Sequence, residues 1–310
     1  MRRGDRLPGV WIAPGAVDDP RGLLRFGPLG GVAVPVGPVV GGRGGRGAAA
    51  VHGTGPGGVE HDEAPGLDLV EAVDRLRWCA TRDLRALVAV RGTTPGEPAT
   101  LAGRLCRGLE GDAVAAVEVD LRGADDQHCL RVLARVREET PRDLLLLARL
   151  SALHPDLVGC ARAAVAGGAG AVVVCGAVPL GPGRWWSGAS TAALCRSGVR
   201  TLALAAVEQR WPAVPVVAAG GVHDVSSARA ALREGAQAVQ LGSALWADPT
   251  VLWAVLDGLD PATGTDTQTG SHGHTGGGRH TGGGRHTGGG RHTGGGRHTG
   301  SDTDTHPEES

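Results

Sequence analysis

One segment near the end of the apolar part of the sequence indicates the architecture: it begins Val216-Val217-Ala218-Ala219-Gly220-Gly221, continues with a helical pattern over residues 225–234, and ends Ala238-Val239-Gln240-Leu241-Gly242-Ser243. The two short runs of Val, Ala and Leu read as strands that are buried on both faces. Asp224 stands just ahead of the helical pattern as its N-cap, and Gly235 follows it where a positive φ often ends a helix. The segment therefore predicts a strand, a helix and a second, parallel strand.

The same unit repeats toward the N-terminus. Strands are predicted over residues 10–13, 32–36, 86–90, 116–121, 144–150, 171–176, 214–219 and 238–242. Helices are predicted between them, over residues 67–80, 99–109, 127–139, 155–166, 199–210, 225–234 and 249–256. About eight such units in roughly 250 residues is the count for a (β/α)8 barrel. A doubly wound open sheet has the same local pattern, but the count favours a single barrel over residues 1–260.

Composition excludes several classes of protein. The chain has 310 residues, a formal net charge of −1 and 41% hydrophobic residues. The charge balance argues against nucleic-acid binding, which needs a surplus of basic side chains on one face. No apolar run approaches the ~18 residues of a membrane span, and Met1-Arg2-Arg3 leads into no signal-peptide core. The six cysteines show no CxxC spacing, so reduced thiols, a cytoplasmic location and no metal site are expected.

Three residue types are missing from the chain, and their absence limits its chemistry. The sequence contains no Lys, no Asn and no Tyr. A mechanism that needs a lysine amine, an asparagine carboxamide or a phenol is therefore not open to this protein.

The last 50 residues, 261–310, differ from the rest. They hold four copies of Thr-Gly-Gly-Gly-Arg-His and seven of the twelve histidines, with almost no apolar side chain. Such a segment cannot offset the entropy of ordering, so we expect a disordered His/Gly/Arg-rich tail. Spaced imidazoles would chelate Ni, Cu or Zn weakly, and the alternative is an inert tail.

Candidate binding residues stand at the ends of the last two strands. In a (β/α)8 barrel the chemistry lies at the carboxyl ends of the strands, and phosphate binding after strands seven and eight recurs. Gly220 and Gly221 end one strand, and Gly242 and Ser243 end the next. Glycine lets backbone N–H groups approach a phosphate closely, although the same glycines could simply make tight turns. Long connections are expected over residues 37–66 and 177–198: the first is rich in Gly and Arg and expected to be mobile, and the second carries Trp185 and Trp186 and could fold over a ligand.

The residues around these glycines resemble the C-terminal barrel segment of the dihydroorotate dehydrogenase family. Members of that family are FMN-dependent barrels that oxidise dihydroorotate to orotate. The resemblance spans nearly all of residues 10–257 and is strongest after residue 144. Ile12-Ala13-Pro14-Gly15 is similar to the family's first-strand Ala-Ser-Gly. Residues 116–121 stand where the family has Glu-Xaa-Asn-Xaa-Ser, and Ala148-Arg149-Leu150-Ser151 where it has Val-Lys-Leu-Ser. Ser197-Gly198 is similar to its Leu-Ser-Gly before the seventh helix.

The resemblance implies an FMN site and names its residues. Gly220, Gly221, Gly242 and Ser243 would hold the phosphate, with Gly198 closing one side. Two further residues, Ala13 and Gly15, would touch the isoalloxazine ring. Arg149 would stand in for the lysine that stabilises negative charge on reduced flavin, although its planar fork makes the exchange non-conservative. The alternative for Arg149 is a surface or helix-pairing role.

The chain departs from the family at its catalytic positions. The family's second lysine falls near Pro35-Val36, and its orotate-binding asparagines fall at Asp120 and Gly176. An ionised Asp120 would repel a carboxylate substrate. The loop that bears the family's Cys or Ser base is shortened to residues 122–127. Cys129, next to His128, is then the candidate catalytic residue, against the alternative of a cysteine that only packs.

Two carboxylates on one strand form a further candidate group. Glu118 and Asp120 lie two residues apart, so their side chains share a face. They could share a proton, bind a divalent cation, or form a structural ion pair, for which Arg149 on the neighbouring strand is the expected partner. Of these alternatives, the structural ion pair is the one we expect.

These observations lead to three hypotheses. The first is a cytoplasmic, FMN-dependent oxidoreductase with a small-molecule substrate, similar to the cytosolic dihydroorotate dehydrogenases of pyrimidine biosynthesis and acting on CH–CH groups. The second is a catalytically degenerate barrel that binds FMN or another phosphate ligand without turnover. The third is a lyase or isomerase that handles a phosphate compound on the same scaffold. No membrane or nucleic-acid partner is expected, and a homo-oligomer is left open.

Overall fold

A computed structural model of the protein describes residues 8–42, 44 and 49–260. The predicted tail over residues 261–310 lies outside the described residues.

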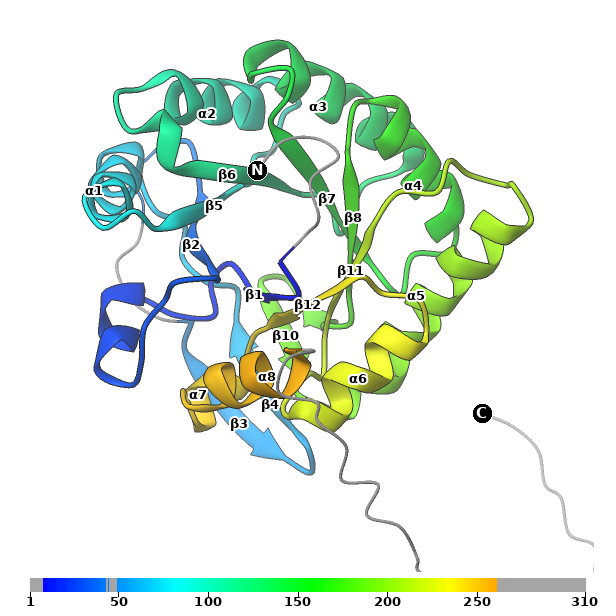
Figure 1. The fold of residues 1–310 in the computed structure, drawn as a ribbon. Coiled ribbons are helices and arrows are strands. Elements are labelled where there is room, and N and C mark those ends of the chain that lie inside the picture. Colours follow the sequence, from blue (N-terminus) through cyan, green and yellow to red (C-terminus); the bar gives the residue numbers. More distant parts are fainter. Residues whose placement is uncertain (1–7, 43, 45–48, 261–310) are drawn as a thin grey trace, which may run out of the picture. The chain divides into compact units, whose positions relative to one another are not determined.

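Eight parallel strands form a closed barrel (Figure 1). The strands follow one another around the barrel in chain order, and the last pairs with the first through the register Val10↔Val239. They are β1 (Val10–Ile12), β2 (Ala33–Val39), β5 (Arg85–Val90), β6 (Val114–Asp120), β7 (Leu145–Ser151), β8 (Ala171–Cys175), β11 (Val216–Ala219) and β12 (Ala238–Leu241). Closure excludes an open sheet and confirms the predicted (β/α)8 fold.

Helices alternate with the barrel strands and surround them in Figure 1. They are α1 (Leu69–Ala80), α2 (Gly96–Arg107), α3 (Asp126–Glu139), α4 (Leu157–Ala166), α5 (Ala192–Val207), α6 (Val225–Arg233), α7 (Ala244–Ala247) and α8 (Val251–Leu259). The short 3-10 helices are η1 (Pro20–Arg25), η2 (Gly111–Ala113) and η3 (Ala189–Thr191). The side chain of Asp224 caps α6 in a capping box with Ser227, and Gly235 has a φ of +112° after the helix, as predicted.

The buried side chains form two layers, one on each face of the barrel wall. Strand residues that point outward pack against the helices in a large apolar core. The inner layer fills the barrel with Trp11, Ala33, Leu87, Ala116, Leu145, Leu147, Ala171, Val173, Val217, Ala219 and Ala238. Because both faces of each strand are buried, the strands read as nearly continuous apolar runs. The charged strand residues Glu118 and Arg149 stand beyond this layer, toward the carboxyl ends of the strands.

The two long connections are not simple loops, because they contribute a second sheet. This antiparallel sheet, here called the cap sheet, has the order β3-β4-β10-β9. Its strands are β3 (Val51–Gly55), β4 (Gly58–Asp62), β9 (Val178–Gly181) and β10 (Arg184–Ser187). The register between β4 and β10 pairs His61 with Trp185 and Val59 with Ser187. The cap sheet therefore joins segments from the second and sixth connections of the barrel.

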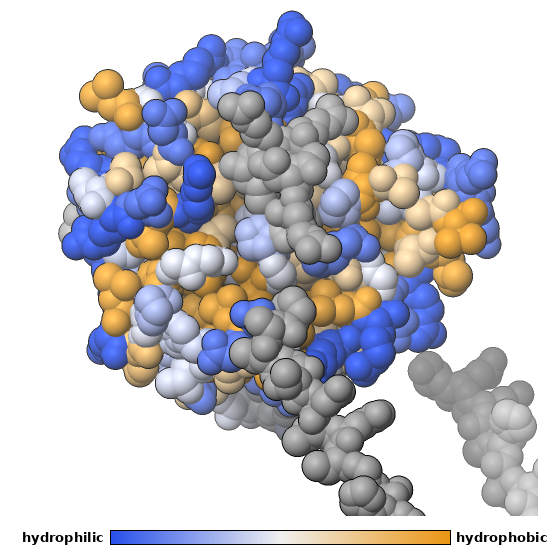
Figure 2. Space-filling model, viewed as in Figure 1, coloured by the Kyte–Doolittle hydropathy of each residue, from blue (hydrophilic) through white to orange (hydrophobic). Residues whose placement is uncertain are grey.

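The surface of the described part of the chain carries both hydrophilic and hydrophobic residues (Figure 2). On the face seen in Figure 2, hydrophilic residues gather along the rim and hydrophobic residues lie more often toward the middle. Among the described residues, no helix is both long enough and apolar enough to cross a membrane.

Candidate active site

A cavity of about 320 Å³ lies between the cap sheet and the carboxyl ends of the barrel strands. Its volume is in the range of small-molecule sites. The barrel contributes residues at or just beyond its strand ends, among them Ala13, Gly15, Glu118, Arg149, Gly220 and Gly242. The cap sheet contributes one face of β4 and β10, with Val59, His61, Trp185 and Ser187. The cavity thus lies where a barrel of this kind carries its chemistry.

The floor of the cavity is a buried ion pair. Arg149 Nη1 on β7 donates to Glu118 Oε1 on β6 over 2.9 Å, and also to Gln240 Oε1 on β12 over 3.1 Å. Gln240 Nε2 donates to the other carboxylate oxygen of Glu118 over 2.6 Å. Burial alone would lower the pKa of Arg149, but neighbouring Cys175 and Glu118 raise it overall, so the guanidinium stays charged. The expected partnership between Arg149 and Glu118 is confirmed.

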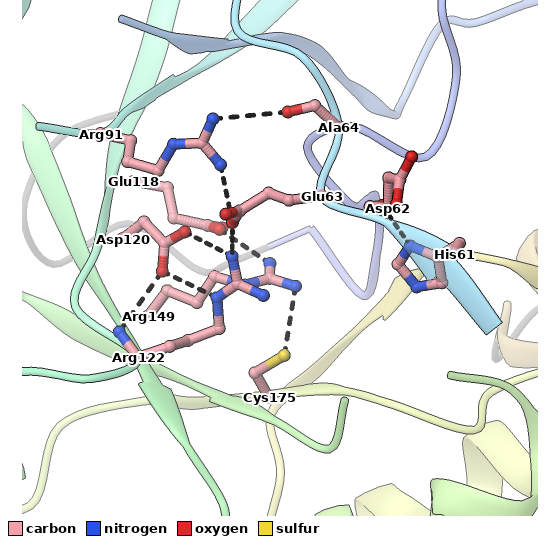
Figure 3. Close-up of polar contacts among 10 residues, drawn as sticks. All are labelled: His61, Asp62, Glu63, Ala64, Arg91, Glu118, Asp120, Arg122, Arg149 and Cys175. Atoms are coloured by element: carbon pink, nitrogen blue, oxygen red, sulfur yellow. Dashed lines mark hydrogen bonds and ion pairs between the residues drawn. The ribbon is translucent and has the colours of Figure 1, made fainter. Parts of the chain in front are cut away.

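A second charged group links the barrel to the cap sheet (Figure 3). Arg122 donates to both carboxylate oxygens of Asp120, from Nε over 2.8 Å and from Nη2 over 2.6 Å. Glu63 Oε1, just after β4, accepts from Arg122 Nη2 and from Arg91 Nη1, each over 2.6 Å. Burial would raise the pKa of Asp120, but Arg122 outweighs it and lowers that pKa to about 2. The expected Arg149 thus pairs with one of the two carboxylates, Glu118, and the partner of Asp120 is Arg122, which was not predicted.

The two groups leave the charges of the cavity balanced. Its ionised lining residues are three arginines and three carboxylates: Arg91, Arg122, Arg149, Glu63, Glu118 and Asp120. Each carboxylate pairs with at least one of these arginines. The expectation that Asp120 would repel an anion therefore changes, because Arg122 neutralises it. Equally, each arginine already has an anionic partner.

The adjacent tryptophans of β10 have different roles. Trp185 faces the cavity, and the guanidinium carbon of Arg122 lies 4.1 Å from its ring centroid in a cation–π contact. Its buried Nε1–H has no acceptor among the described residues. Trp186 lies on the other face of the strand and donates from Nε1 to Ser190 Oγ over 2.8 Å. Trp186 therefore anchors the connection, while Trp185 holds an arginine of the site.

A histidine and a serine of the cap sheet meet in the cavity. His61 Nε2 lies 3.0 Å from Ser187 Oγ, and His61 Nδ1 lies 2.6 Å from the carbonyl oxygen of Asp62. The Trp246 ring packs edge-on against the imidazole, with ring centroids 5.0 Å apart. Burial lowers the pKa of His61, so the ring is neutral near pH 7.

Most of the residues predicted to bind the cofactor come together here. All but one line the cavity: Ala13, Gly15, Arg149, Gly220, Gly221, Gly242 and Ser243. The glycines differ in what surrounds them. A Cβ at Gly221 would clash with Ala192 at 2.4 Å, so tight packing against α5 requires that glycine. A Cβ at Gly242 would meet only Ala13 Cβ, 3.9 Å away, so this glycine borders open space.

The exception is Gly198, which does not line the cavity. It lies within α5, not in a loop before the helix, and a Cβ there would come within 2.8 Å of Val174 Cγ1. Packing of the helix on β8 explains this glycine. The Ser-Gly pair that directly precedes the helical segment is Ser187-Gly188, and both of its residues line the cavity. Gly188 has a φ of +130°, which favours glycine.

Cys129 is also misplaced for the role considered for it. It lies on α3, fully buried and outside the cavity lining, and burial raises the pKa of its thiol to about 12. A group that stays protonated cannot act as a thiolate. The histidine near this region is His154, whose Nε2 lies 3.5 Å from Cys160 Sγ, and not the adjacent His128. The packing alternative for Cys129 holds.

Several site residues were not foreseen. His61, Glu63 and Ser187 come from the long connections, and only the pairing of β4 with β10 brings them together. One signal was available: Ser187-Gly188 repeats the Ser-Gly motif at a better position than Ser197-Gly198. Within the described residues there is no group of three or more His, Cys, Asp or Glu side chains that could hold a metal ion.

Comparison with known proteins supports the resemblance drawn from the sequence. No family model matches the chain. The chain is 28% identical over 205 residues to a dihydroorotate dehydrogenase B (NAD(+)) catalytic subunit from Geotalea daltonii, covering 60% of this chain and 66% of that protein. It is 30% identical over 187 residues to the same subunit from Trichlorobacter lovleyi, covering 54% and 60%. The chain thus spans less than two thirds of the length of these relatives.

The fold comparison agrees. The structure of a dihydroorotate dehydrogenase from Eimeria tenella, solved in complex with ferulenol, superposes with a TM-score of 0.59. It covers 81% of this chain and 80% of that one, at 16% sequence identity. The predicted resemblance to dihydroorotate dehydrogenases is confirmed, with divergence at the positions where the family has its lysines and asparagines.

Proposed function

We propose that this protein is an FMN-dependent oxidoreductase, similar to dihydroorotate dehydrogenases, that moves hydride between a substrate C–H and flavin N5. The observation that carries the proposal is the cavity at the barrel mouth, where all but one of the residues predicted to bind the cofactor meet. The similarity to dihydroorotate dehydrogenase B catalytic subunits supports the same class of reaction. A cytoplasmic location and an FMN-binding domain over residues 1–260 are parts of this proposal.

The residues present fit an FMN molecule. Gly242 borders open space beside Ala13, so the ends of β12 and β1 leave room for a ligand. Backbone N–H groups at Gly220, Gly221, Gly242 and Ser243 would hold the phosphate. When bound, FMN supplies a two-electron acceptor at N5.

Arg149 is the residue of this chain best placed to tune a flavin. Its side chain is only 13% exposed, and it lines the cavity while Glu118 and Gln240 fix its orientation. A fixed cation in a site of low dielectric stabilises developing negative charge more strongly than a solvated one. Its guanidinium would therefore favour the reduced, anionic form of the ring system, as the corresponding lysine does in the family.

The proposal is tested with the purified full-length protein and FMN. Titration should quench flavin fluorescence and give a protein-bound flavin spectrum with a micromolar or tighter Kd. Anaerobic addition of dihydroorotate should then bleach the flavin absorption. A protein that stays colourless and leaves FMN fluorescence unchanged would rule out the flavin assignment.

A second candidate is a barrel that binds FMN without turnover. It is favoured by one observation: the short connection over residues 122–127 bears no Cys or Ser, and its Arg122 is held by Asp120 and Glu63. A flavin spectrum that does not bleach with dihydroorotate or with any of a panel of CH–CH substrates would support this candidate.

A further inference from the structure

The cap sheet places one hydroxyl next to one imidazole inside the cavity. Val59, His61, Trp185 and Ser187 share the face of β4 and β10 that lines the cavity. Because side chains alternate along a strand, this register directs the His61 and Ser187 side chains to the same side. Their contact of 3.0 Å joins residues 126 positions apart in the sequence.

The hydrogen bonds of His61 assign its protons. The Asp62 carbonyl oxygen can only accept, so Nδ1, which lies 2.6 Å away, carries the proton. In the neutral ring Nε2 then has a free lone pair, and it accepts the hydrogen bond of the Ser187 hydroxyl. Trp246 packs against the ring and limits its rotation. Ser187 thus has an oriented base within hydrogen-bonding distance.

The carboxylates and the Cys175 thiol that line the cavity are engaged by arginines. Glu63, Glu118 and Asp120 each accept from an arginine. Cys175 Sγ is contacted by Arg149 Nη2 at 3.4 Å. His223 also lines the cavity, but its side chain is 46% exposed and it lies in the loop after β11, among the glycines proposed for phosphate.

Oxidation of a CH–CH group removes a hydride from one carbon and a proton from its neighbour, so the site needs a proton acceptor. We propose that Ser187 and His61 are that acceptor, which is an inference that rests on the function proposed above. As hydride leaves one substrate carbon for the flavin, Ser187 Oγ takes the proton of the adjacent carbon and gives its own proton to His61 Nε2. The electron pair of that second C–H bond forms the new C=C bond. The imidazolium keeps its hydrogen bond to the Asp62 carbonyl, so no co-reactant beyond the flavin is required.

An activated hydroxyl can be detected without a substrate or a flavin. Phenylmethanesulfonyl fluoride is added to the flavin-free protein, and intact mass with peptide mapping follows the rate of modification at each serine. Ser187 should react at least about 100-fold faster than Ser243, which also lines the cavity but has no histidine contact. His61→Gln should remove this advantage, Ser187→Ala should abolish labelling at that peptide, and the control His128→Gln, on α3 and outside the cavity lining, should label normally.

The two proposals fail separately in this design. FMN titration of the same variants reports on the flavin site and on folding, and wild-type protein that binds no FMN counts against the proposed function alone. Reaction of Ser187 no faster than Ser243, or reaction that persists unchanged in His61→Gln, overturns the proton-accepting pair. In FMN-loaded protein, His61→Gln should slow bleaching by substrate about 100-fold while the Kd for FMN stays unchanged.

Discussion

Arg149 and Glu118 face each other inside the barrel from adjacent strands, with Arg149 Nη1 2.9 Å from Glu118 Oε1. Gln240 on β12 hydrogen-bonds to both side chains. This triad lies where the apolar filling of the barrel gives way to the cavity. A charge buried at that depth is tolerated only when it has a partner. The stability of the barrel and the polarity of the site therefore depend on the same contacts.

Glu118→Gln tests this dependence. The substitution keeps the shape of the side chain but leaves Arg149 with a buried charge and no anion, so unfolding free energy should fall by about 3 kcal/mol. Urea denaturation of the flavin-free protein measures it. Glu138→Gln is the matched control, because its ion pair with Arg135 is mostly exposed and should change stability by less than about 0.5 kcal/mol. Equal losses of unfolding free energy in the two variants would show that the buried ion pair contributes no more to stability than the exposed one.

Acid should weaken the link between Asp120 and Arg122. The pKa of Asp120 is lowered to about 2, so its ionised form stabilises the fold above the unfolded pKa of about 3.9, and the contribution is lost as pH falls toward 2. The free energy of unfolding of the wild-type protein should exceed that of Asp120→Asn by about 2 kcal/mol near pH 7. Urea denaturation across a pH series should show a difference that is constant down to about pH 5 and shrinks below about pH 4. A difference that grows toward acid pH would contradict the assignment.

The barrel itself was predictable because each strand is buried on both faces and therefore appears in the sequence as a run of Val, Ala and Leu. The predicted strand over residues 171–176 differs from β8 by one residue at its end. Helix α5 was less well placed: it was predicted from residue 199 but begins at Ala192, since the preceding residues were assigned to a loop. The cap sheet was not predicted, because strands such as β3 and β4 are rich in Gly, His and Glu and lack a clear alternation.

The candidate site, like the fold, was predicted only in part. Gly242 was found because it follows one of the barrel strands, whose carboxyl ends must meet, whereas Ala13 and Arg149 were found through the resemblance to dihydroorotate dehydrogenases. His61 and Ser187 could not be found by position, since the register that joins them is set by tertiary pairing. Propensity and spacing do not encode such a register.

The glycine at the end of β12 offers a direct test of the phosphate site. Because only Ala13, at 3.9 Å, lies within 4 Å of a Cβ at Gly242, a Cβ is accommodated there and a side chain borders the cavity. Gly242→Asp would place a carboxylate beside the phosphate and should weaken FMN binding by about 100-fold or more. Gly242→Asn has the same size without the charge and should weaken it by less than about 10-fold. Fluorescence titration compares the two, and equal Kd values would place the phosphate elsewhere.

The charge balance of the cavity predicts how it treats an anionic substrate. Glu63 pairs with both Arg91 and Arg122, and Glu118 pairs with Arg149. Each arginine that lines the cavity therefore already has an anionic partner, and none is available to pair with a substrate carboxylate. Orotate and uracil share a pyrimidine ring and differ by the carboxylate, which makes them a matched pair of probes. The FMN-loaded protein should bind uracil at least as tightly as orotate, as measured by flavin difference spectra. Glu63→Gln releases both arginines from their shared carboxylate and should improve orotate binding by about 10-fold, with uracil unchanged. Wild-type protein that prefers orotate by more than about 10-fold would show that the arginines exchange their carboxylate partners for the ligand.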